Sequence, residues 1–243
     1  MNNKIDIFIT GYLRPQMSEM TLKYLKERTR YPYRLFFINN GGSDEFLINH
    51  AEEFFLVIDP GVNIGIHAAW NISLALAESD YFITTDNDIL VPDVEPDWLT
   101  QLISMMDARP DFGAIALQPH QFIGLEPSRH PNDGEILYTP MVGAVARLMR
   151  RDAVWKANGW ERVIRSSRNH EERHICSRLN DVGYKFGYTS KLKAFHMFGG
   201  GEFDSWGYPK EMKPEDHGHH LIWPLPETHG DIAKYDNKTW ERL

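Results

Sequence analysis

The stretch Tyr81-Phe82-Ile83-Thr84-Thr85-Asp86-Asn87-Asp88-Ile89 decides the fold, because an aromatic and β-branched run ends there in two carboxylates one residue apart. Such a run is typical of a strand buried in a parallel sheet. In open α/β sheets ligands bind beyond the carboxyl ends of the strands, so Asp86 and Asp88 are expected to project toward a ligand. Two interpretations stay open from these residues alone. The acids hold a divalent metal on a diphosphate, or Asp and Asn merely close a turn.

Short apolar runs alternate with amphipathic segments through the first half of the chain. The expected strands cover residues 5–9, 35–38, 55–58 and 81–85, and the expected helices cover residues 18–28, 44–50, 66–77 and 97–108. This alternation predicts βα units with right-handed crossovers, and hence an α/β fold with a largely parallel sheet. We expect Ser18 to begin the first helix, with Leu22 and Leu25 on its inner face.

The second half loses this regular alternation after about residue 117 and becomes richer in Pro, Gly and His. We expect a strand at 141–149, helices at 151–157 and 171–182, and a last strand at 191–196. The sequence is loop-like from Gly199 onward. Residues 1–200 are therefore predicted to form one catalytic domain. Residues 201–243 are expected to form a C-terminal extension with one of three roles: a lid, an acceptor cover or an oligomer contact. The oligomeric state stays open.

Composition excludes several functional classes. The 243 residues are 42% hydrophobic and 25% charged, as in ordinary globular proteins. No apolar run approaches the roughly 20 residues that cross a bilayer, and the formal net charge of −8 argues against nucleic acid as the main partner. Residues 1–12 lack the features of a secretory signal, so a cytoplasmic location is expected. The lone Cys176 cannot form an intrachain disulfide and is predicted to be a small core residue.

Polar loops follow the predicted strands in a definite order, although the common phosphate-binding and dinucleotide-binding glycine motifs are missing. In sequence they are Thr10-Gly11-Tyr12-Leu13-Arg14, residues 39–44, Asn63-Ile64-Gly65, Asp86-Asn87-Asp88, Arg150-Arg151-Asp152, Glu171-Glu172 and His196.

This ordered series resembles the family 2 glycosyltransferases with the GT-A fold, over residues 4–200. Asp86-Asn87-Asp88 stands at the family's Asp-x-Asp motif. Arg150-Arg151-Asp152 with Gly159-Trp160 resembles its acceptor-side Arg-Arg-Glu…Gly-Gly-Phe segment, and Glu171-Glu172 with Gly183-Tyr184 resembles its Glu-Asp…Gly-Tyr helix. The resemblance implies a GT-A (Rossmann-like), mostly parallel central sheet flanked by helices, with a loop-rich C-terminal extension.

The resemblance also implies a divalent metal, Mn²⁺ or Mg²⁺, on the diphosphate of the donor. By resemblance Asp88 binds the metal directly, Asp86 reaches the ribose or the metal's water shell, and His196 is a further ligand. Carboxylate oxygens suit either ion, whereas an imidazole ligand favours manganese. From the sequence alone, His196 could equally be a histidine whose hydrogen bonds are satisfied within a loop.

The loops after the first strands match the family's donor-binding positions. The aromatic ring of Tyr12 is expected to stack on the base. Asn40 stands where relatives commonly carry an aspartate that accepts from uracil, and an amide can both donate and accept. A UDP-sugar is therefore the favoured donor, with the base less certain than the nucleotide sugar. The residues expected to contact the donor are Thr10, Tyr12, Arg14, Asn40, Asn63, Asp86 and Asn87.

The base that deprotonates the acceptor is expected at the start of the helix predicted at 171–182. By resemblance it is Glu172, where relatives usually have Asp, and Glu171 is the competing candidate. A second interpretation also holds, since acidic residues at a helix N-terminus stabilise it by about 0.3–1 kcal/mol each.

The function implied is transfer of a sugar, hexosyltransferase-like and inverting, from a nucleoside-diphosphate sugar to a glycan, glycolipid or small hydroxyl acceptor. The family expectation is polysaccharide biosynthesis, with transient work at a membrane face. Three alternatives stay open: a nucleotide-sugar or carbohydrate-binding protein without transfer activity, a retaining transferase, and a sugar nucleotidyltransferase.

The C-terminal extension carries two further candidate features. His217, His219 and His220 lie beside Asp216 and could bind a second metal, although a His-rich tail is only a compositional cue. Trp206 and Trp223 could form a stacking platform for an acceptor sugar, although packing of the tail is the commoner role for such side chains.

Overall fold

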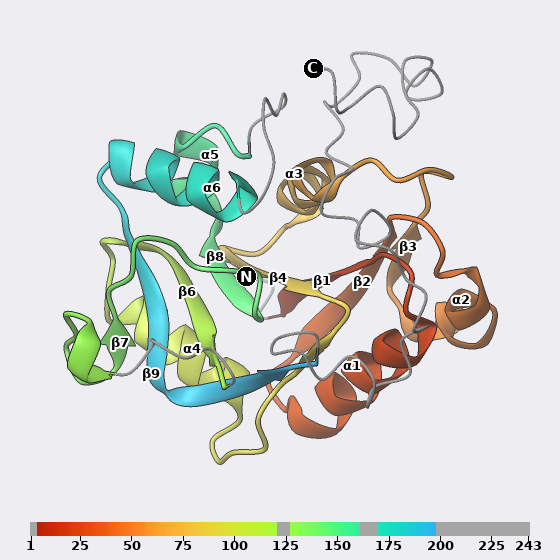
Figure 1. Cartoon of the computed structure of the whole chain (residues 1–243), viewed down its shortest axis with the longest axis horizontal. Helices are drawn as coiled ribbons and strands as arrows, with labels where there is room; N and C mark the ends of the chain where they lie inside the picture. Colours follow the sequence, from red (N-terminus) through yellow and green to blue (C-terminus); the bar gives the residue numbers. More distant parts are fainter. Residues whose placement is uncertain (1–3, 121–126, 161–169, 198–243) are drawn as a thin grey trace.

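A curled central sheet organises the chain in a computed structural model that describes residues 4–120, 127–160 and 170–197 (Figure 1). The strands are β1 (Ile5–Gly11), β2 (Tyr33–Asn39), β3 (Leu56–Ile58), β4 (Tyr81–Asp86), β5 (Ile89–Leu90), β6 (Phe112–Pro119), β7 (Ile136–Leu137), β8 (Arg147–Arg150) and β9 (Lys185–His196). The helices are α1 (Pro15–Arg28), α2 (Asp44–His50), α3 (Ile66–Leu76), α4 (Trp98–Asp107), α5 (Arg151–Lys156) and α6 (His170–Asp181). Short 3₁₀ turns lie at Ala51–Glu53 and Pro127–Arg129.

The strands follow the order β3-β2-β1-β4-β8-β6-β9-β5, with β7 paired to β9. Neighbouring strands from β3 to β4 run parallel, as the alternating βα pattern predicts. Strand β8 runs antiparallel between β4 and β6, whereas β6 and β9 are again parallel. Short strands β5 and β7 pair antiparallel with β9.

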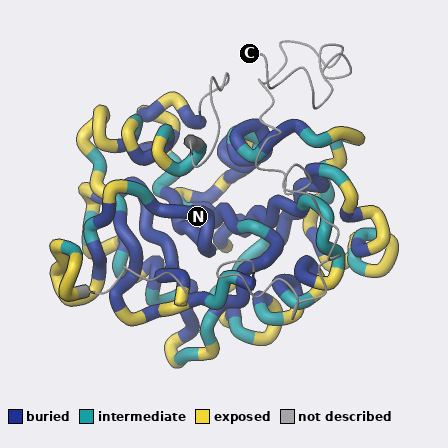
Figure 2. The backbone as a smooth tube through the Cα atoms, in the orientation of Figure 1, coloured by how far each residue is buried: buried dark blue, intermediate teal, exposed yellow. Residues whose placement is uncertain are grey.

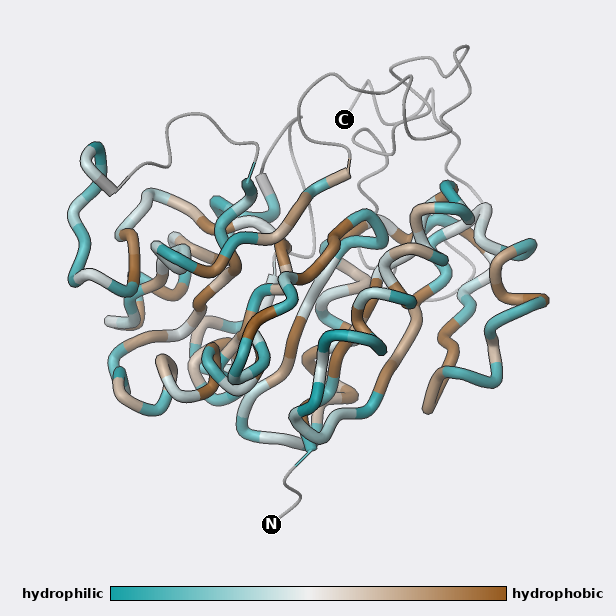
Figure 3. Tube along the Cα trace, turned by 90° about the horizontal axis from the view of Figure 1, so that it is seen from below, coloured by the Kyte–Doolittle hydropathy of each residue, from teal (hydrophilic) through white to brown (hydrophobic). Residues whose placement is uncertain are grey.

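Among the described residues, three helices pack on each face of the sheet. Successive residues of a strand point to opposite faces, so they contact different helices. Ile7 and Ile9 of β1 pack in one core with residues of α1, α2 and α4. Phe8 packs in the other core with residues of α3, α5 and α6. The central strands are mostly buried, the edge strand β3 is partly exposed, and the outer sides of the helices are exposed (Figure 2). The apolar residues follow the strands and the inner helix faces (Figure 3).

The sequence prediction was wrong at several boundaries in the second half. No strand was predicted for β6, whose sequence mixes Gly113, Ala114 and Ala116 with large apolar residues and is buried throughout. The strand expected at 141–149 is only β8, because residues 141–146 form a loop that crosses the sheet edge. The strand expected at 191–196 begins six residues earlier, at Lys185.

Helix α1 begins at Pro15, not at Ser18 as predicted. Proline at the first helical position has its φ preset for a helix and no N–H to leave unsatisfied. Ser18 is instead buried inside the helix. The preceding Leu13 and Arg14 adopt left-handed φ values of 54° and 61°, which is uncommon for residues with side chains and is concentrated at functional sites.

None of the helices in the described residues is long and apolar enough to cross a membrane. The predicted extension at 201–243 lies outside the described residues, as do Trp206, Asp216, His217, His219, His220 and Trp223.

A buried ion pair fastens the amino ends of the first strands. Asp6 is fully buried in β1 and accepts from Arg34 of β2, with Nε and Nη2 at 2.7 and 3.0 Å. The backbone N–H of Glu78 donates to the same carboxylate at 2.9 Å. Asp6 therefore ties β1, β2 and the connection into β4 together.

We expect Asp6→Ala to lower the free energy of unfolding by about 3–5 kcal/mol, since it leaves the guanidinium of Arg34 without its buried partner. The matched control is Glu27→Ala, which removes an exposed pair with Lys23 at 4.0 Å and should cost less than about 1 kcal/mol. Urea denaturation of both variants measures the difference. Equal losses would contradict the role given to Asp6.

Candidate functional site

The carboxyl ends of β1, β2 and β4 meet at one edge of the sheet and bring the predicted loops together. The register pairs Thr10 with Asp86 and Gly11 with Asn39. The chain then turns directly into β5, where Ile89 pairs with His196 of β9. Residues more than 100 positions apart in the sequence thus reach the same edge.

Asp88 is the centre of this cluster. Its side chain is 3% exposed, and Arg14 Nη1 donates to Asp88 Oδ2 at 2.9 Å. His196 Nε2 lies 3.3 Å from the other oxygen, Asp88 Oδ1. The backbone carbonyl of Asp88 accepts from the N–H of Met197 at 2.8 Å, which holds the end of β9 against the turn. The structure therefore brings together three residues that the sequence predicted separately.

Asn87 fastens this turn to the first loop. Its amide nitrogen donates to Leu13 O at 3.1 Å and to Ser18 Oγ at 2.8 Å, and the side chain is buried. The amide that was predicted to face the donor is thus used within the fold. Asn87 sets the spacing between the two acids and the left-handed loop at Leu13 and Arg14.

The two acids have opposite electrostatic environments. Burial raises the pKa of Asp86 to about 7, and the negative charge of Asp88 adds to this effect. Burial also disfavours ionised Asp88, but the positive charges of His196 and Arg14 outweigh it and lower its pKa below the ordinary value. The charge of Asp88 in turn raises the pKa of His196 against the effect of burial. The cluster therefore holds Asp88 charged and leaves Asp86 about half protonated at pH 7.

The remaining donor-site candidates hold their loops by side-chain to backbone hydrogen bonds. Asn40 Oδ1 accepts from the N–H of Ile64 at 2.8 Å, joining the loops after β2 and β3. Asn63 Oδ1 accepts from the N–H of Gly65 at 2.8 Å, just before α3. Thr10 is buried, and its hydroxyl finds no hydrogen-bond partner among the described residues. Tyr12 is half-buried beside Gly41, where an added Cβ would lie 3.6 Å from the ring.

The acids at the start of α6 face the same edge. A Cβ on Gly143 would lie 3.1 Å from Glu172 Oε1 and 3.2 Å from the hydroxyl of Tyr188, so glycine there lets the carboxylate approach the backbone. Burial raises the pKa of Glu172 to about 8, with the charges of Glu171 and Asp86 acting in the same direction. Glu171 likewise raises the pKa of Asp86. The helix predicted to carry the base is thus electrostatically linked to the Asp86–Asp88 turn.

Arg147 is a residue that the sequence analysis missed. It is fully buried in β8, its Nε donates to Thr84 Oγ1 at 3.3 Å, and its Nη1 donates to Val142 O at 3.1 Å. Its guanidinium lies 4.5 Å from the ring of Trp70 and 5.6 Å from that of Trp160. The signal was a single charge inside the apolar run at residues 141–149.

The guanidinium of Arg147 acts on the acids above it, because in a buried environment charges are weakly screened. Its positive charge lowers the pKa of both Glu172 and Asp86, opposing the effect of burial. The buried guanidinium of Arg147 therefore stabilises the ionised form of both carboxyl groups, Asp86 and Glu172.

The chemistry of the cluster fits a divalent metal that completes its shell with substrate oxygens. Asp88 Oδ1 is buried without a well-aligned hydrogen bond from any described residue, and His196 lies beside it. In residues 4–120, 127–160 and 170–197, no three His, Cys, Asp or Glu side chains form a metal site by themselves. Mg²⁺ sites on nucleotides commonly take only one or two carboxylates from the protein, with phosphates and waters as the other ligands, so such a site does not require three protein ligands.

The segment resembling the acceptor-side motif lies elsewhere. Arg150 pairs with Tyr81, at the opposite end of β4 from Asp86, because β8 runs antiparallel to β4. Its guanidinium donates to Phe112 O at 2.8 Å and to Met106 O at 3.0 Å, which caps the end of α4. Trp160 exchanges two hydrogen bonds with Asn71 of α3, at 3.0 and 3.1 Å.

Cys176 is buried and burial raises its pKa to about 11, which fits the predicted core role.

The sequence matches the model of the family described as glycosyl transferase family 2 over residues 6–189. No curated protein matches the sequence at a significant level.

Solved glycosyltransferases share the fold. A mannosyltransferase from Pyrobaculum calidifontis in complex with GDP-Man and Mn²⁺ superposes with a TM-score of 0.65 at 15% identity, covering 84% of this chain and 59% of that one. GalNAc-T7 with UDP, GalNAc and Mn²⁺ gives 0.62 at 12% identity, with 80% and 44% covered. S. aureus TarS gives 0.61 at 11% identity, with 84% and 38% covered. The chain thus spans between 38% and 59% of the length of these proteins.

We expect Asp86→Asn to stabilise the metal-free protein at pH 8. The pKa of Asp86 is about 7 in the folded state against 3.8 when unperturbed, so the charged form opposes folding, and the cost in stability accumulates as the pH rises from 3.8 to about 7 and is fully present above it. The gain in Tm should vanish at pH 4. Asp88→Asn should instead lower Tm at pH 8, since a lowered pKa means that ionised Asp88 stabilises the fold. Thermal unfolding in EDTA measures both, and shifts of the same sign at pH 8 would contradict this assignment.

Proposed function

The chain belongs to glycosyl transferase family 2, and we propose that it transfers a sugar from a nucleoside-diphosphate sugar to a hydroxyl acceptor with inversion at the anomeric carbon. The proposal rests on one observation: Asp86, Asp88, Arg14 and His196 meet at one edge of the sheet. Glu172 lies close enough that the charges of Asp86 and His196 shift its pKa. The GT-A architecture supports it, since one solved structure of this fold holds GDP-Man with Mn²⁺ at 15% identity and another holds UDP, GalNAc and Mn²⁺ at 12% identity.

Asp88 and His196 would hold Mn²⁺ or Mg²⁺ on the diphosphate, and the ion would neutralise the charge that develops on the leaving group. Arg14 reaches Asp88 Oδ2 at 2.9 Å and is placed to donate to a phosphate oxygen when the diphosphate binds. Asp86 has a pKa of about 7, so in the free protein its carboxyl is about half protonated at neutral pH and would form a hydrogen bond with ribose in either state.

The donor base is expected to meet the loops after β1, β2 and β3. Tyr12 offers a half-buried ring for stacking. The oxygen of Asn40 already accepts from Ile64, so the amide hydrogens are the groups that it can offer to a base. The amide N–H of Asn40 would donate a hydrogen bond to a carbonyl of uracil or guanine, whereas an aspartate at this position would accept a hydrogen bond from a base N–H. UDP remains the favoured nucleotide, and GDP is the alternative that this amide also suits.

Glu172 is the proposed general base. It would take the proton from the acceptor hydroxyl while that oxygen bonds to the anomeric carbon and the bond to the diphosphate breaks. Its position is fixed by the first turn of α6 and by the close approach to Gly143. A glycan, glycolipid or small hydroxyl acceptor would enter beside it, and a cytoplasmic site of action stays a prediction.

A second candidate function is binding of a nucleotide sugar without transfer. The observation that favours it is the raised pKa of Glu172, about 8, which leaves the carboxyl largely protonated at neutral pH in the free protein. A protonated carboxyl cannot accept the proton of the acceptor. Transfer therefore requires that bound donor and metal lower this pKa, or that the reaction proceed at higher pH.

We expect Glu172→Gln to reduce transfer by about 10²–10⁴-fold while the Kd for UDP and Mn²⁺ stays within about twofold. For the native protein kcat/KM should rise with pH toward a plateau above 8, since the base must be deprotonated in the free enzyme. Nucleotide release from a panel of nucleotide sugars in Mn²⁺ measures the rate, and Glu171→Gln is the matched control. Retention of activity in Glu172→Gln with loss in Glu171→Gln would assign the base to Glu171. Donor binding by the native protein without turnover would favour the binding-only function.

A further inference from the structure

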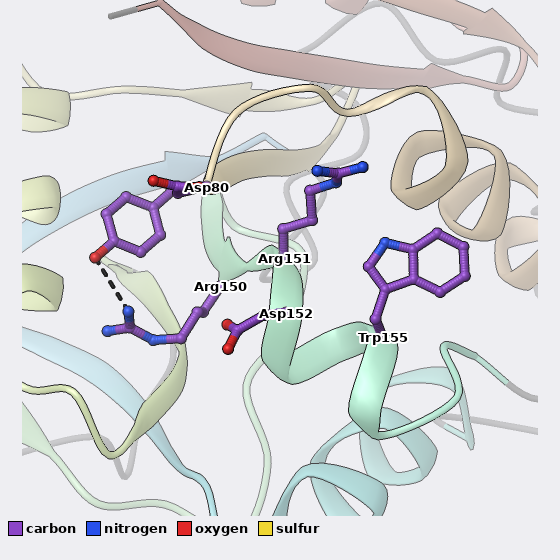
Figure 4. Close-up of a pocket in the computed structure, with 6 residues that line it drawn as sticks. Asp80, Arg150, Arg151, Asp152 and Trp155 are labelled. Atoms are coloured by element: carbon purple, nitrogen blue, oxygen red, sulfur yellow. Dashed lines mark hydrogen bonds between the residues drawn. The ribbon is translucent and has the colours of Figure 1, made fainter. Parts of the chain in front are cut away.

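A pocket of about 490 Å³ lies where β4 begins and β8 runs into α5 (Figure 4). Its lining residues are Asp80, Tyr81, Arg150, Arg151, Asp152 and Trp155. Tyr81 and Asp86 are the two ends of β4, so at about 3.3 Å per residue this pocket is roughly 17 Å from the Asp86–Asp88 turn. It is a separate place on the molecule.

The floor of the pocket is rigidly built. The guanidinium of Arg150 donates to the hydroxyl of Tyr81 at 3.2 Å, the bond drawn in Figure 4, and to the backbone carbonyls that end α4. The hydroxyl of Tyr81 donates to Asp107 at 2.7 Å. The backbone N–H of Arg151 donates to the carbonyl of Asp80 at 2.9 Å, which closes the turn into α5.

The rim of the pocket carries exposed and half-buried side chains, of which Asp152 also pairs with the exposed Lys156 at 3.4 Å. Trp155 is 53% exposed, although large aromatic side chains are usually buried. Arg151 lies one helical turn before it, so both project from the same side of α5. The Nε of Arg151 is buried without a hydrogen-bond partner among the described residues. Asp80 and Asp152 are exposed carboxylates at the same rim.

This set of groups matches a sugar ring. A pyranose offers a face of C–H bonds to an aromatic plane and hydroxyl groups at its edge, and an indole is a large, rigid surface for such contact. Carboxylates accept from hydroxyl groups and a guanidinium donates to them. Three positive charges at and beside the pocket, Arg150, Arg151 and Lys156, are matched by three carboxylates, Asp80, Asp107 and Asp152, so the pocket favours a neutral ligand over a phosphate.

We propose that this pocket is a second binding site that takes a neutral oligosaccharide, with one ring stacked on Trp155 and its hydroxyl groups on Arg151, Asp80 and Asp152. This goes beyond the proposed function, because binding here requires neither the nucleotide donor nor transfer. Such a site would hold a glycan chain on the protein away from the reacting end.

The test is titration of the full chain with maltohexaose, cellohexaose, xylohexaose and chitohexaose, followed by saturation-transfer NMR and calorimetry. We expect at least one hexasaccharide to bind. Trp155→Ala should weaken that binding at least about tenfold, about 1.4 kcal/mol. Trp155→Phe should keep most of it, since an aromatic plane remains. The matched control is Phe55→Ala, which truncates another exposed aromatic ring, 63% exposed, and should leave binding unchanged.

Several outcomes would overturn the proposal. These are no binding of any of the four hexasaccharides to the native protein, equal binding by Trp155→Ala, an equal loss in Phe55→Ala, or competition by inorganic phosphate at the same site. Stabilisation of Trp155→Ala by UDP and Mn²⁺ should match that of the native protein. Loss of glycan binding is thereby distinguished from failure of the proposed transfer function.

Discussion

Negative charge gathered at the carboxyl edge of the sheet is the constraint on which the rest of the site depends. Asp88 is buried, and the environment of Asp86 disfavours its charged form, so both require nearby cations or a proton. Arg14 reaches Asp88 from a left-handed loop, His196 arrives at the end of the last described strand, and Arg147 lies beneath the edge. Two of these cations carry a local cost: an unusual backbone conformation for Arg14, and full desolvation for Arg147, which lowers its pKa. They are retained where the acids require them.

The same constraint explains how distant parts of the chain cooperate. Arg147 is held between Trp70 of α3 and Trp160, and Asn71 of α3 holds Trp160 by two hydrogen bonds. The packing of α3 against the turn after α5 therefore positions the cation under Asp86 and Glu172. Ionised Asp86 and Glu172 destabilise the ligand-free protein, as expected where binding residues are kept close together against their mutual repulsion.

The sequence predicted the parts of this arrangement that depend on local pattern. The parallel first half, the strand ending at Asp86, and the position of His196 at the end of a late strand all follow from periodicity and from residues that belong after strands. The sequence could not predict what depends on tertiary pairing. Strand β6 was hidden by small residues, Ser18 had the character of a helix cap but is buried beside Asn87, and the antiparallel β8 moved Arg150 to the opposite end of β4. Arg147 is the clearest case, because a single charge in an apolar run does not reveal that two distant tryptophan rings, Trp70 and Trp160, pack against its guanidinium.

We propose that the Asp86–Asp88 edge binds a nucleoside diphosphate together with a divalent ion. The most direct measurement is the thermal stabilisation of the native protein and of Asp88→Ala by UDP and by GDP, each in Mn²⁺ and in EDTA. Ligand at about 100 times its Kd stabilises the native state by about 2.7 kcal/mol. One of the nucleotides should stabilise the native protein in Mn²⁺, and EDTA should remove this stabilisation. Asp88→Ala should not be stabilised. Equal stabilisation in EDTA, or in Asp88→Ala, would contradict this proposal.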